Sequence, residues 1–448
     1  MADLKQMALR IFRETIAAID IPETMRRKLS VNGTMLRCGD QEFDLRAFDR
    51  VRVVALGKAA HTMAVGLLAV LPRALRLEGI VVKPSGSTDG TADGTNDAAL
   101  EVAGLKFFTA GHPVPDKESW RAAQAILELL KTCDQRTLMF FLLSGGGSAL
   151  VELPLNSEQS LLDVQQVHRA LVTCGAPIDA INTVRKHLSA VKGGRLAVAA
   201  GGATKIALAV SDVPAGKESA LASGPTIADP TTIADFVRVV REHGLEAQFP
   251  STVKKWLAAG EMPETPKEAH AAFANAHFFL MLGMDDLFHP AHRSAEALGC
   301  VACCDNATDD WPVEKAADFL LRQLEELRKT HPGRSVAVIA DGEVSSPVTG
   351  NGVGGRNSTF VLACVPKIAG KRIVVLSAGT DGIDGNSPAA GAVADGETLS
   401  RGEAAGMDVA EYFRRSDAYG YFARLGDAIV IGPTGNNLRD LRILLAQP

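Results

Sequence analysis

The chain has 448 residues, of which 46% are hydrophobic and 22% are charged, and its formal net charge is -5. This length favours two domains over a single small core. The acidic balance, together with the lack of a basic block or a basic amphipathic helix, argues against nucleic acid and anionic membranes as partners. We therefore expect the partners to be small molecules.

The seven cysteines are an odd number and are scattered mostly through apolar segments, which predicts reduced, buried thiols. The stretch 1–20 has the pattern of an amphipathic helix with acidic residues interspersed, so it does not resemble a secretory signal. No run of about 18 apolar residues could span a bilayer. We expect a cytoplasmic protein without membrane partners.

The first half of the chain alternates short apolar strands with amphipathic helices. We predict a helix over 59–71 and strands at 51–56, 79–82, 138–143 and 205–210. This alternation predicts a mainly parallel sheet covered by helices. A helical region over 231–259 follows, and the polar, proline-bearing stretch 260–266 is suited to a linker.

The same pattern resumes beyond the predicted linker. We predict one long helix over 313–330 and strands at 278–282, 301–304, 336–340, 373–378 and 428–431. The interpretation is a two-domain α/β protein, with an amino-terminal domain over 1–265 and a carboxyl-terminal domain over 266–448.

The most informative segment is the glycine-rich run at 142–150, which follows an apolar strand. It joins two hydroxyls to three glycines, namely Ser144, Gly145, Gly146, Gly147 and Ser148. Residues without Cβ can turn successive amides toward one anion, and a helix that starts near Ser148 would add its dipole. The alternative is a turn that only lets a helix pack closely on the sheet.

Two further loops follow strand-like segments in this half, at 51–56 and 105–109. Lys58 stands where the first strand ends, where it could pair with phosphate or a carboxylate, or be an ordinary solvated lysine. The motif G-x-G-x-x-G does not follow this strand, and the Walker pattern is missing, which disfavours nicotinamide and P-loop chemistry. His112 lies in a loop stiffened by two prolines, so it either binds substrate or shapes the turn.

Cations and a carboxylate complete the candidates of the first half. The segment 185–195 places Lys186, Lys192 and Arg195 near two glycines, which favours a polyanion over a solvated helix end. Asp212 follows the strand at 205–210. Its carboxylate could hold a divalent metal or accept a hydroxyl proton, or it could close a proline turn.

The second half has its own strand-end loops. Glu343 follows one strand, and a second glycine-dense loop at 350–357 ends in Arg356 and Asn357, where the guanidinium would match phosphate or carboxylate. After the strand at 373–378 come Asp381 and Asp384 with flanking glycines. Such carboxylates suit magnesium or hydroxyl recognition, although Asp-Gly pairs also make plain turns.

Taken together, these motifs resemble the class II glycerate kinases, whose carboxyl-terminal domain is called MOFRL. The resemblance is ordered along nearly the full chain and rests on the segments 57–59, 111–113, 143–150, 186–189, 192–195, 211–213, 223–226, 354–357 and 380–385. It implies a Rossmann-like amino-terminal domain, a MOFRL-type α/β domain, an active site in the cleft between them, and phosphorylation of D-glycerate at its 2-hydroxyl with ATP and Mg²⁺.

The resemblance also implies roles for individual residues. Lys58, Asp212 and Arg356 are the expected catalytic residues, and the glycine run with Lys186, Lys192 and Arg195 is expected to bind phosphates or nucleotide. His112, Glu343, Asn357 and Asp381 would contact substrate, while Asp212, Asp381 and Asp384 would hold the metal. A homodimer is a further expectation.

Departures from the family pattern concentrate in the second half. They are Asp341 to Ser346 where relatives carry Gly-Gly-Glu and two threonines, Ser358 to Phe360 where Gln-Glu-Phe is usual, and Gly435 to Asp440 where many end Gly-Thr-Asn-Val-Asn-Asp. The alternatives are a hydroxypyruvate reductase, a label that some relatives carry, and a non-catalytic sugar-acid binding protein.

Overall fold

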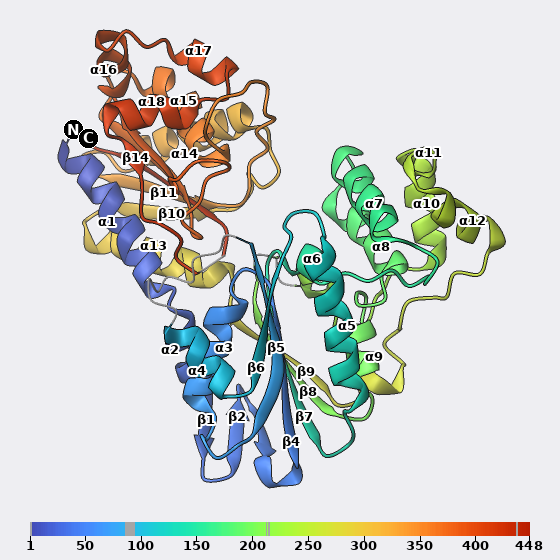
Figure 1. Cartoon of the computed structure of the whole chain (residues 1–448). Coiled ribbons are helices and arrows are strands. Elements are labelled where there is room, and N and C mark those ends of the chain that lie inside the picture. The colour runs from blue at the N-terminus through green and yellow to red at the C-terminus, as the bar shows by residue number, and fades with distance from the viewer. Residues whose placement is uncertain (1, 86–94, 212, 214–215, 436–437) are drawn as a thin grey trace. The chain divides into compact units, whose positions relative to one another are not determined.

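The computed structural model describes residues 2–85, 95–211, 213, 216–435 and 438–448. The chain forms two compact units. We call Ile21–Gly283 the amino unit, and Met1–Asp20 with Met284–Pro448 the carboxyl unit (Figure 1). Of the predicted site residues, only Asp212 lies outside the described residues.

The amino unit is built on a parallel six-stranded sheet in the order β6-β5-β4-β7-β8-β9. Every residue of the central strand β7 is buried, and its run of Leu, Met and Phe explains why the sequence shows no alternation there. Since all six strands are parallel, the loops after them meet at one edge. The strands are β4 (Arg50–Leu56), β5 (Leu77–Pro84), β6 (Leu105–Ala110), β7 (Thr137–Ser144), β8 (Thr204–Val210) and β9 (Ala276–Leu282).

Helices cover both faces of this sheet (Figure 1). One face packs on α2 (Ile21–Lys28), α3 (Ala60–Val70) and α4 (Thr95–Val102), and the other on α5 (Lys117–Lys131), α6 (Gly147–Leu150) and α9 (Arg195–Ala199). A separate apolar cluster forms where five further helices pack on one another. They are α7 (Leu161–Thr173), α8 (Ile178–Leu188), α10 (Ile233–Glu242), α11 (Leu245–Gln248) and α12 (Ser251–Ala259).

The carboxyl unit has a mixed six-stranded sheet in the order β10-β11-β15-β12-β13-β14. Only β10 and β11 pair in parallel, because the last strand inserts antiparallel between β11 and β12. The start of β15 therefore meets the ends of β11 and β12. The strands are β10 (Val301–Asp305), β11 (Val336–Asp341), β12 (Ile373–Gly379), β13 (Gly391–Asp395), β14 (Ala428–Ile429) and β15 (Asp440–Ala446).

Helices also cover both faces of the mixed sheet (Figure 1). One face packs on α1 (Ala2–Ala18) and α13 (Met284–Ala297). The other carries α14 (Val313–Thr330), which matches the predicted helix, and α15 (Arg356–Ile368). The remaining helices are α16 (Thr398–Ala404), α17 (Val409–Arg414) and α18 (Ala418–Leu425). Among the helices of the described ranges, none has the length and apolarity needed to cross a bilayer.

The compact units do not follow the division predicted from sequence. The helix α1 packs in the carboxyl unit, because its buried face of Leu4, Ala8 and Ile11 contacts α13 and the mixed sheet. The strand β9 completes the amino sheet beside β8. The predicted linker 260–266 is instead held within the amino unit, where the Asp229 amide donates to the Pro266 carbonyl at 3.0 Å. The division falls at 283/284.

Several elements were not predicted. A small antiparallel sheet precedes the main one, formed by β1 (Leu29–Asn32), β2 (Met35–Cys38) and β3 (Gln41–Asp44), and β13 and β15 had no counterpart in the sequence interpretation. Within the described residues, short 3₁₀ helices also occur, namely η1 (Leu45–Ala47), η2 (Glu218–Ser223) and η3 (Ala271–Phe273). As predicted, all seven cysteines are unpaired, and only Cys304 is exposed.

Candidate active site

In the amino unit, the turn after β4 lies directly against the turn after β7. The Ala59 amide donates to Ser144 Oγ at 3.0 Å, and the Lys58 amide donates to the Gly145 carbonyl at 3.0 Å. A Cβ on Gly57 would lie 2.2 Å from Ser144 Oγ, so only glycine allows this approach. The Ser144 hydroxyl is fully buried and joins the two turns. Phosphate binding by Ser144 stays a prediction from sequence, and the bond that the structure shows for this hydroxyl is the one to the Ala59 amide.

The glycine run forms a cradle beside two predicted site residues. Gly146 has φ +83°, and a Cβ built on it would lie 3.2 Å from His112 Nε2 and 3.4 Å from Lys58 Cγ. Lys58 and His112 therefore flank the space that the missing side chain leaves open. A helix starts near Ser148 as predicted, but α6 has only four residues, so its dipole is short. Its first amides, at Gly147 and Ser148, have no acceptor within the helix.

The electrostatics of this cradle suit an anion. Burial and the neighbouring charge of Lys58 lower the pKa of His112, so the imidazole is neutral near pH 7. A neutral imidazole can still donate one hydrogen bond. The ammonium of Lys58 carries the positive charge of the cradle, and the loop before Pro113 holds His112 beside it.

Ser148 faces a polar neighbour that sequence analysis did not connect to it. Its Oγ lies 2.8 Å from Ser223 Oγ, and Ser223 Oγ donates to Asn182 Oδ1 at 3.0 Å. Ser223 has the left-handed conformation at φ +60° and Ala222 at φ +49°, which L residues seldom adopt. Both are buried against the glycine run, where a Cβ on Gly147 would lie 3.0 Å from the Ala222 Cβ.

The cations of the segment 185–195 make ion pairs and hydrogen bonds within the protein. Lys186 Nζ lies 3.2 Å from Asp229 Oδ1, Lys192 Nζ lies 2.6 Å from Glu152 Oε2, and Arg195 donates to the Lys186 carbonyl at 2.7 Å. Lys186 and Lys192 are 4% and 1% exposed. Lys186 and Lys192 are thus paired with buried carboxylates, whereas one terminal nitrogen of Arg195 is buried without a hydrogen-bond partner. Phosphate binding by the three residues stays a prediction from sequence.

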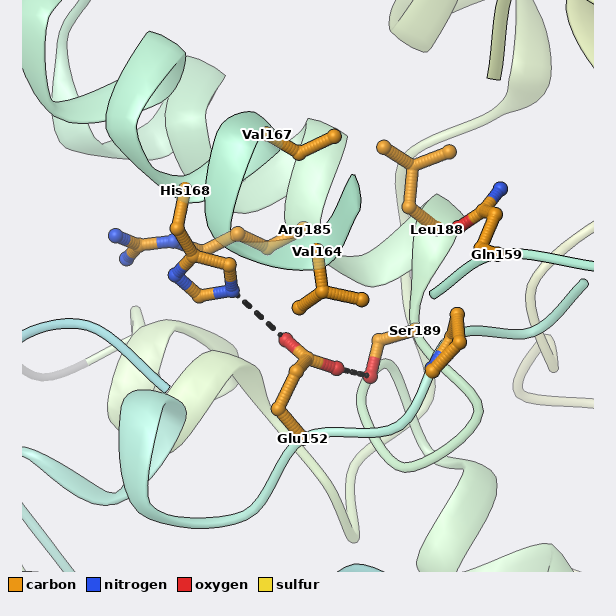
Figure 2. Close-up of a pocket in the computed structure, with 9 residues that line it drawn as sticks. Glu152, Gln159, Val164, Val167, His168, Arg185, Leu188 and Ser189 are labelled. Atoms are coloured by element: carbon orange, nitrogen blue, oxygen red, sulfur yellow. Dashed lines mark hydrogen bonds and ion pairs between the residues drawn. The ribbon is translucent and has the colours of Figure 1, made fainter. Parts of the chain in front are cut away.

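Glu152 is the centre of this buried network, which we call the Glu152 hub (Figure 2). Its carboxylate accepts from Ser189 Oγ at 2.6 Å, contacts His168 Nε2 at 3.0 Å and pairs with Lys192. The positive charge of Lys192 and the bond to His168 outweigh burial and lower the pKa of Glu152 to about 2. Figure 2 shows the carboxylate reaching toward both His168 and Ser189. The hub joins the segment after α6 to α7 and to the C-terminal end of α8.

The carboxyl unit gathers charges where β11 and β12 end and β15 begins, in what we call the Arg356 cluster. Arg356 is held by two carboxylates, with Nε 2.5 Å from Asp440 Oδ2 and the two terminal nitrogens 2.6 and 2.8 Å from the Glu343 oxygens. The two carboxylates raise the pKa of Arg356. Since the Arg356 side chain is 37% exposed and Asp440 is buried, the cation has a fixed position at the surface of the unit.

Of the other predicted site residues of this unit, Asp384 and Asn357 are buried and Asp381 is half-buried. Asp384 accepts from the amides of Asn357 and Ser358, each at 2.9 Å, and so caps α15. It is 2% exposed. Asn357 is buried and accepts from Ser377 Oγ at 2.5 Å. These contacts give both residues a structural role, and the metal role of Asp384 and the substrate role of Asn357 stay predictions. Asp381 is half-buried and accepts from the Ile383 amide at 3.1 Å, which leaves it at the surface of the loop.

Sequence reasoning missed the carboxylates and guanidinium groups that complete the Arg356 cluster. Arg439 pairs with Asp309 and lies 3.4 Å from Asp341 Oδ2. Burial raises the pKa of Asp341 to about 6. Asp440 is the last residue of the segment 435–440, which departs from the family pattern. The antiparallel insertion of β15 brings it beside Arg356, and no local pattern predicts that insertion.

No group of three His, Cys, Asp or Glu side chains arranged for a metal occurs within the described ranges. A Mg²⁺ site does not require such a group, because Mg²⁺ typically takes one or two carboxylates with substrate phosphates and waters. Oxygen atoms that fit such an ion are present at Ser148 in the amino unit and at Asp381 in the carboxyl unit.

Comparison with known proteins assigns both halves of the chain to families. Residues 7–258 match a family described as a domain of unknown function, DUF4147, and residues 336–440 match the MOFRL family. The chain is 34% identical over 443 residues to a D-glycerate 2-kinase of Thermotoga maritima, covering 98% of each chain. It is also 35% identical over 401 residues to a putative hydroxypyruvate reductase of Agrobacterium vitis, covering 88% of this chain and 87% of that protein.

The fold agrees with these relationships. The crystal structure of a glycerate kinase from Thermotoga maritima aligns with a TM-score of 0.80 and 33% identity, covering the whole of both chains. The predicted α/β class with a parallel amino sheet and a MOFRL domain is thus confirmed.

Proposed function

Because the chain belongs to the glycerate kinase family with a carboxyl-terminal MOFRL domain, and is accordingly a kinase, we propose that it transfers a phosphoryl group from ATP to the 2-hydroxyl of D-glycerate. The products are 2-phosphoglycerate and ADP. The observation that carries the proposal is the cradle at Gly146, where the missing side chain leaves room between Lys58 and His112.

The chemistry of phosphoryl transfer matches this cradle. The transition state spreads negative charge over the transferring oxygens, and positioned cations and amides stabilise it. In our proposal Lys58 neutralises this charge, and the amides of Gly147 and Ser148 bind phosphate oxygens. The neutral His112 offers a hydrogen-bond donor beside them.

In the carboxyl unit we propose Arg356 as the second catalytic cation, with Glu343 and Asp440 setting its orientation. Asp440 and Glu343 take both two-donor edges of the guanidinium, so substrate would be contacted through the one N–H of Nη1 that remains. Asp381 is proposed to contact substrate or metal. Asp212 is retained as the proposed acceptor of the hydroxyl proton, on the family resemblance alone.

Mg²⁺ is part of the proposal. When bound, it would offset the negative charge of the phosphate oxygens. Asp212, Asp381 and Asp384 stay the predicted ligands, as the family resemblance implies. The cytoplasmic location and the homodimer stay predictions.

The reductase name carried by some relatives gives the competing function. Against it, the turn after β4 reads Gly57-Lys58-Ala59-Ala60 and has none of the further glycines that let a dinucleotide pyrophosphate approach the backbone. The side chain of Lys58 occupies this turn instead. The kinase assignment also replaces the expectation of a non-catalytic binding protein.

The test is to incubate the purified chain with ATP, Mg²⁺ and D-glycerate and to follow the product by phosphorus NMR, which separates the 2-phosphate from the 3-phosphate. We expect the 2-phosphoglycerate signal, and none when D-glycerate is left out. A 3-phosphoglycerate signal would contradict the proposed regiochemistry. Oxidation of NADH or NADPH with hydroxypyruvate, without phosphoryl transfer, would favour the reductase.

A further inference from the structure

The row of side chains Asn182, Ser223 and Ser148 determines which way the Ser148 hydroxyl points. Asn182 Oδ1 can only accept, so the Ser223 hydroxyl must donate to it, across 3.0 Å. A hydroxyl has one proton, and that of Ser223 is then used. The 2.8 Å contact between Ser148 and Ser223 must therefore carry the proton of Ser148. Ser148 donates inward, and its oxygen has only lone pairs left.

The surroundings hold this row firmly in place. Asn182 is 5% exposed and Ser223 is 1% exposed. The Gly193 amide donates to the Ser223 carbonyl at 3.1 Å, and the Gly194 amide donates to the Gly224 carbonyl at 2.7 Å, which fixes the loop in its left-handed conformation. Such conformations cost free energy and persist where the surrounding structure imposes them, often next to functional groups.

An oxygen without a proton to give cannot donate to a phosphate oxygen. It suits a partner that supplies positive charge or a proton, and Mg²⁺ prefers oxygen ligands of this kind. Ser148 lies in the first turn of α6, beside the amides proposed to bind phosphate. A cation carried by those phosphates would be close to this oxygen.

We propose that Ser148 is a ligand of the nucleotide-bound divalent cation and not a phosphate donor, and that Ser223 and Asn182 are positioning residues that turn its lone pairs outward. This rests on the proposed function, since it requires that nucleotide binds at the glycine run. It replaces the sequence-based expectation that the Ser148 hydroxyl holds phosphate.

The experiment measures the affinity of ADP by calorimetry, once with Mg²⁺ and once with EDTA. For Ser148→Ala we expect the gain in affinity that Mg²⁺ provides to fall about tenfold, which corresponds to about 1.4 kcal/mol. The affinity without metal should stay within about twofold, because the amides of the glycine run are untouched.

The positioning residues have their own variants. Ser223→Gly removes the hydroxyl and suits the left-handed backbone, and Asn182→Ala removes the acceptor, so each should lower the Mg²⁺ gain about threefold. Asn182→Asp retains an acceptor and should preserve the gain. The matched control is Ser85→Ala, a serine just after β5 whose hydroxyl donates to the Ala110 carbonyl, and it should behave as wild type.

Two results would overturn the proposal. One is an equal loss of ADP affinity in Ser148→Ala with and without Mg²⁺, which would make Ser148 a phosphate donor. The other is an unchanged Mg²⁺ gain in that variant. If the wild-type chain bound no ADP at all, the proposed function would fail too, so the two failures are distinguishable.

Discussion

The Glu152 hub of the amino unit and the Arg356 cluster of the carboxyl unit both join cations to carboxylates, yet they differ in what they leave available. The side chains of Glu152 and Lys192 are 6% and 1% exposed, whereas those of Glu343 and Arg356 are 47% and 37% exposed. The hub uses its charges to join helices. The cluster holds one guanidinium at a surface. A dense run of cations in a sequence therefore does not by itself identify a ligand site.

The largest expected effect is on the hub. Lys192→Met would leave the Glu152 carboxylate buried without its cation, which should lower the free energy of unfolding by about 3–5 kcal/mol. Urea unfolding followed by circular dichroism measures this. Adding Glu152→Gln to the same chain should restore much of the loss. If Lys192→Met lost less than about 1 kcal/mol of unfolding free energy and bound nucleotide more weakly, Lys192 would be a nucleotide-binding residue and not a structural one.

For the cluster the expected effect is on catalysis. Arg356→Lys keeps one charge, but three ammonium donors cannot reproduce the four contacts to Glu343 and Asp440 and still leave one donor for substrate, so kcat should fall about 100-fold. Steady-state kinetics with D-glycerate measure it, and Arg415→Lys, an exposed arginine of the same unit, serves as the control. Wild-type kcat in Arg356→Lys would remove the residue from the proposed mechanism.

Lowering the pH should weaken the stabilisation that the Glu152 hub provides. The pKa of Glu152 is lowered to about 2 from an ordinary 4.5, so its stabilisation is complete above pH 4.5 and is lost as the pH falls toward 2. Between pH 5 and pH 3 this contribution should fall by about 2 kcal/mol. We expect the stability of Glu152→Gln to decline less steeply than that of wild type over this range. Parallel slopes in urea unfolding would contradict the assignment.

The smallest expected effect concerns the carboxylate beside the cluster. Asp384→Ala removes the cap of α15 and should cost about 1–2 kcal/mol of unfolding free energy. The matched control is Asp408→Ala, which removes an exposed cap from the short helix α17. That variant should lose less. If Asp384→Ala instead kept its stability and lost Mg²⁺ affinity, the result would support the metal role that the sequence predicts for Asp384.

The same contrast shows what the sequence could predict. Periodicity placed β4, β7, β8, β11, β12 and α14 closely, because each buries a continuous or helical apolar face. Periodicity could not assign α1 or β9 to the correct unit, because an apolar face shows that an element packs on something but not on which element. It also missed β15, whose antiparallel insertion joins Asp440 to Arg356.

For the site, the motifs indicated the glycine run, Lys58 and His112, which the structure brings together at Gly146. They could not show which cations are already paired. The partners of Lys186 and Lys192, namely Asp229 and Glu152, lie 43 and 40 residues away in the chain. No local spacing connects residues at that distance.

The most direct test of the account compares nucleotide binding by two variants of the amino unit. Lys58→Met removes the charge at the Gly146 cradle, and Arg195→Gln removes a charge that the structure places within the protein. Titration with ATP and Mg²⁺ should show at least a tenfold loss of affinity for Lys58→Met and less than a twofold change for Arg195→Gln. The reverse order would place the phosphates at the segment 185–195 and contradict the account.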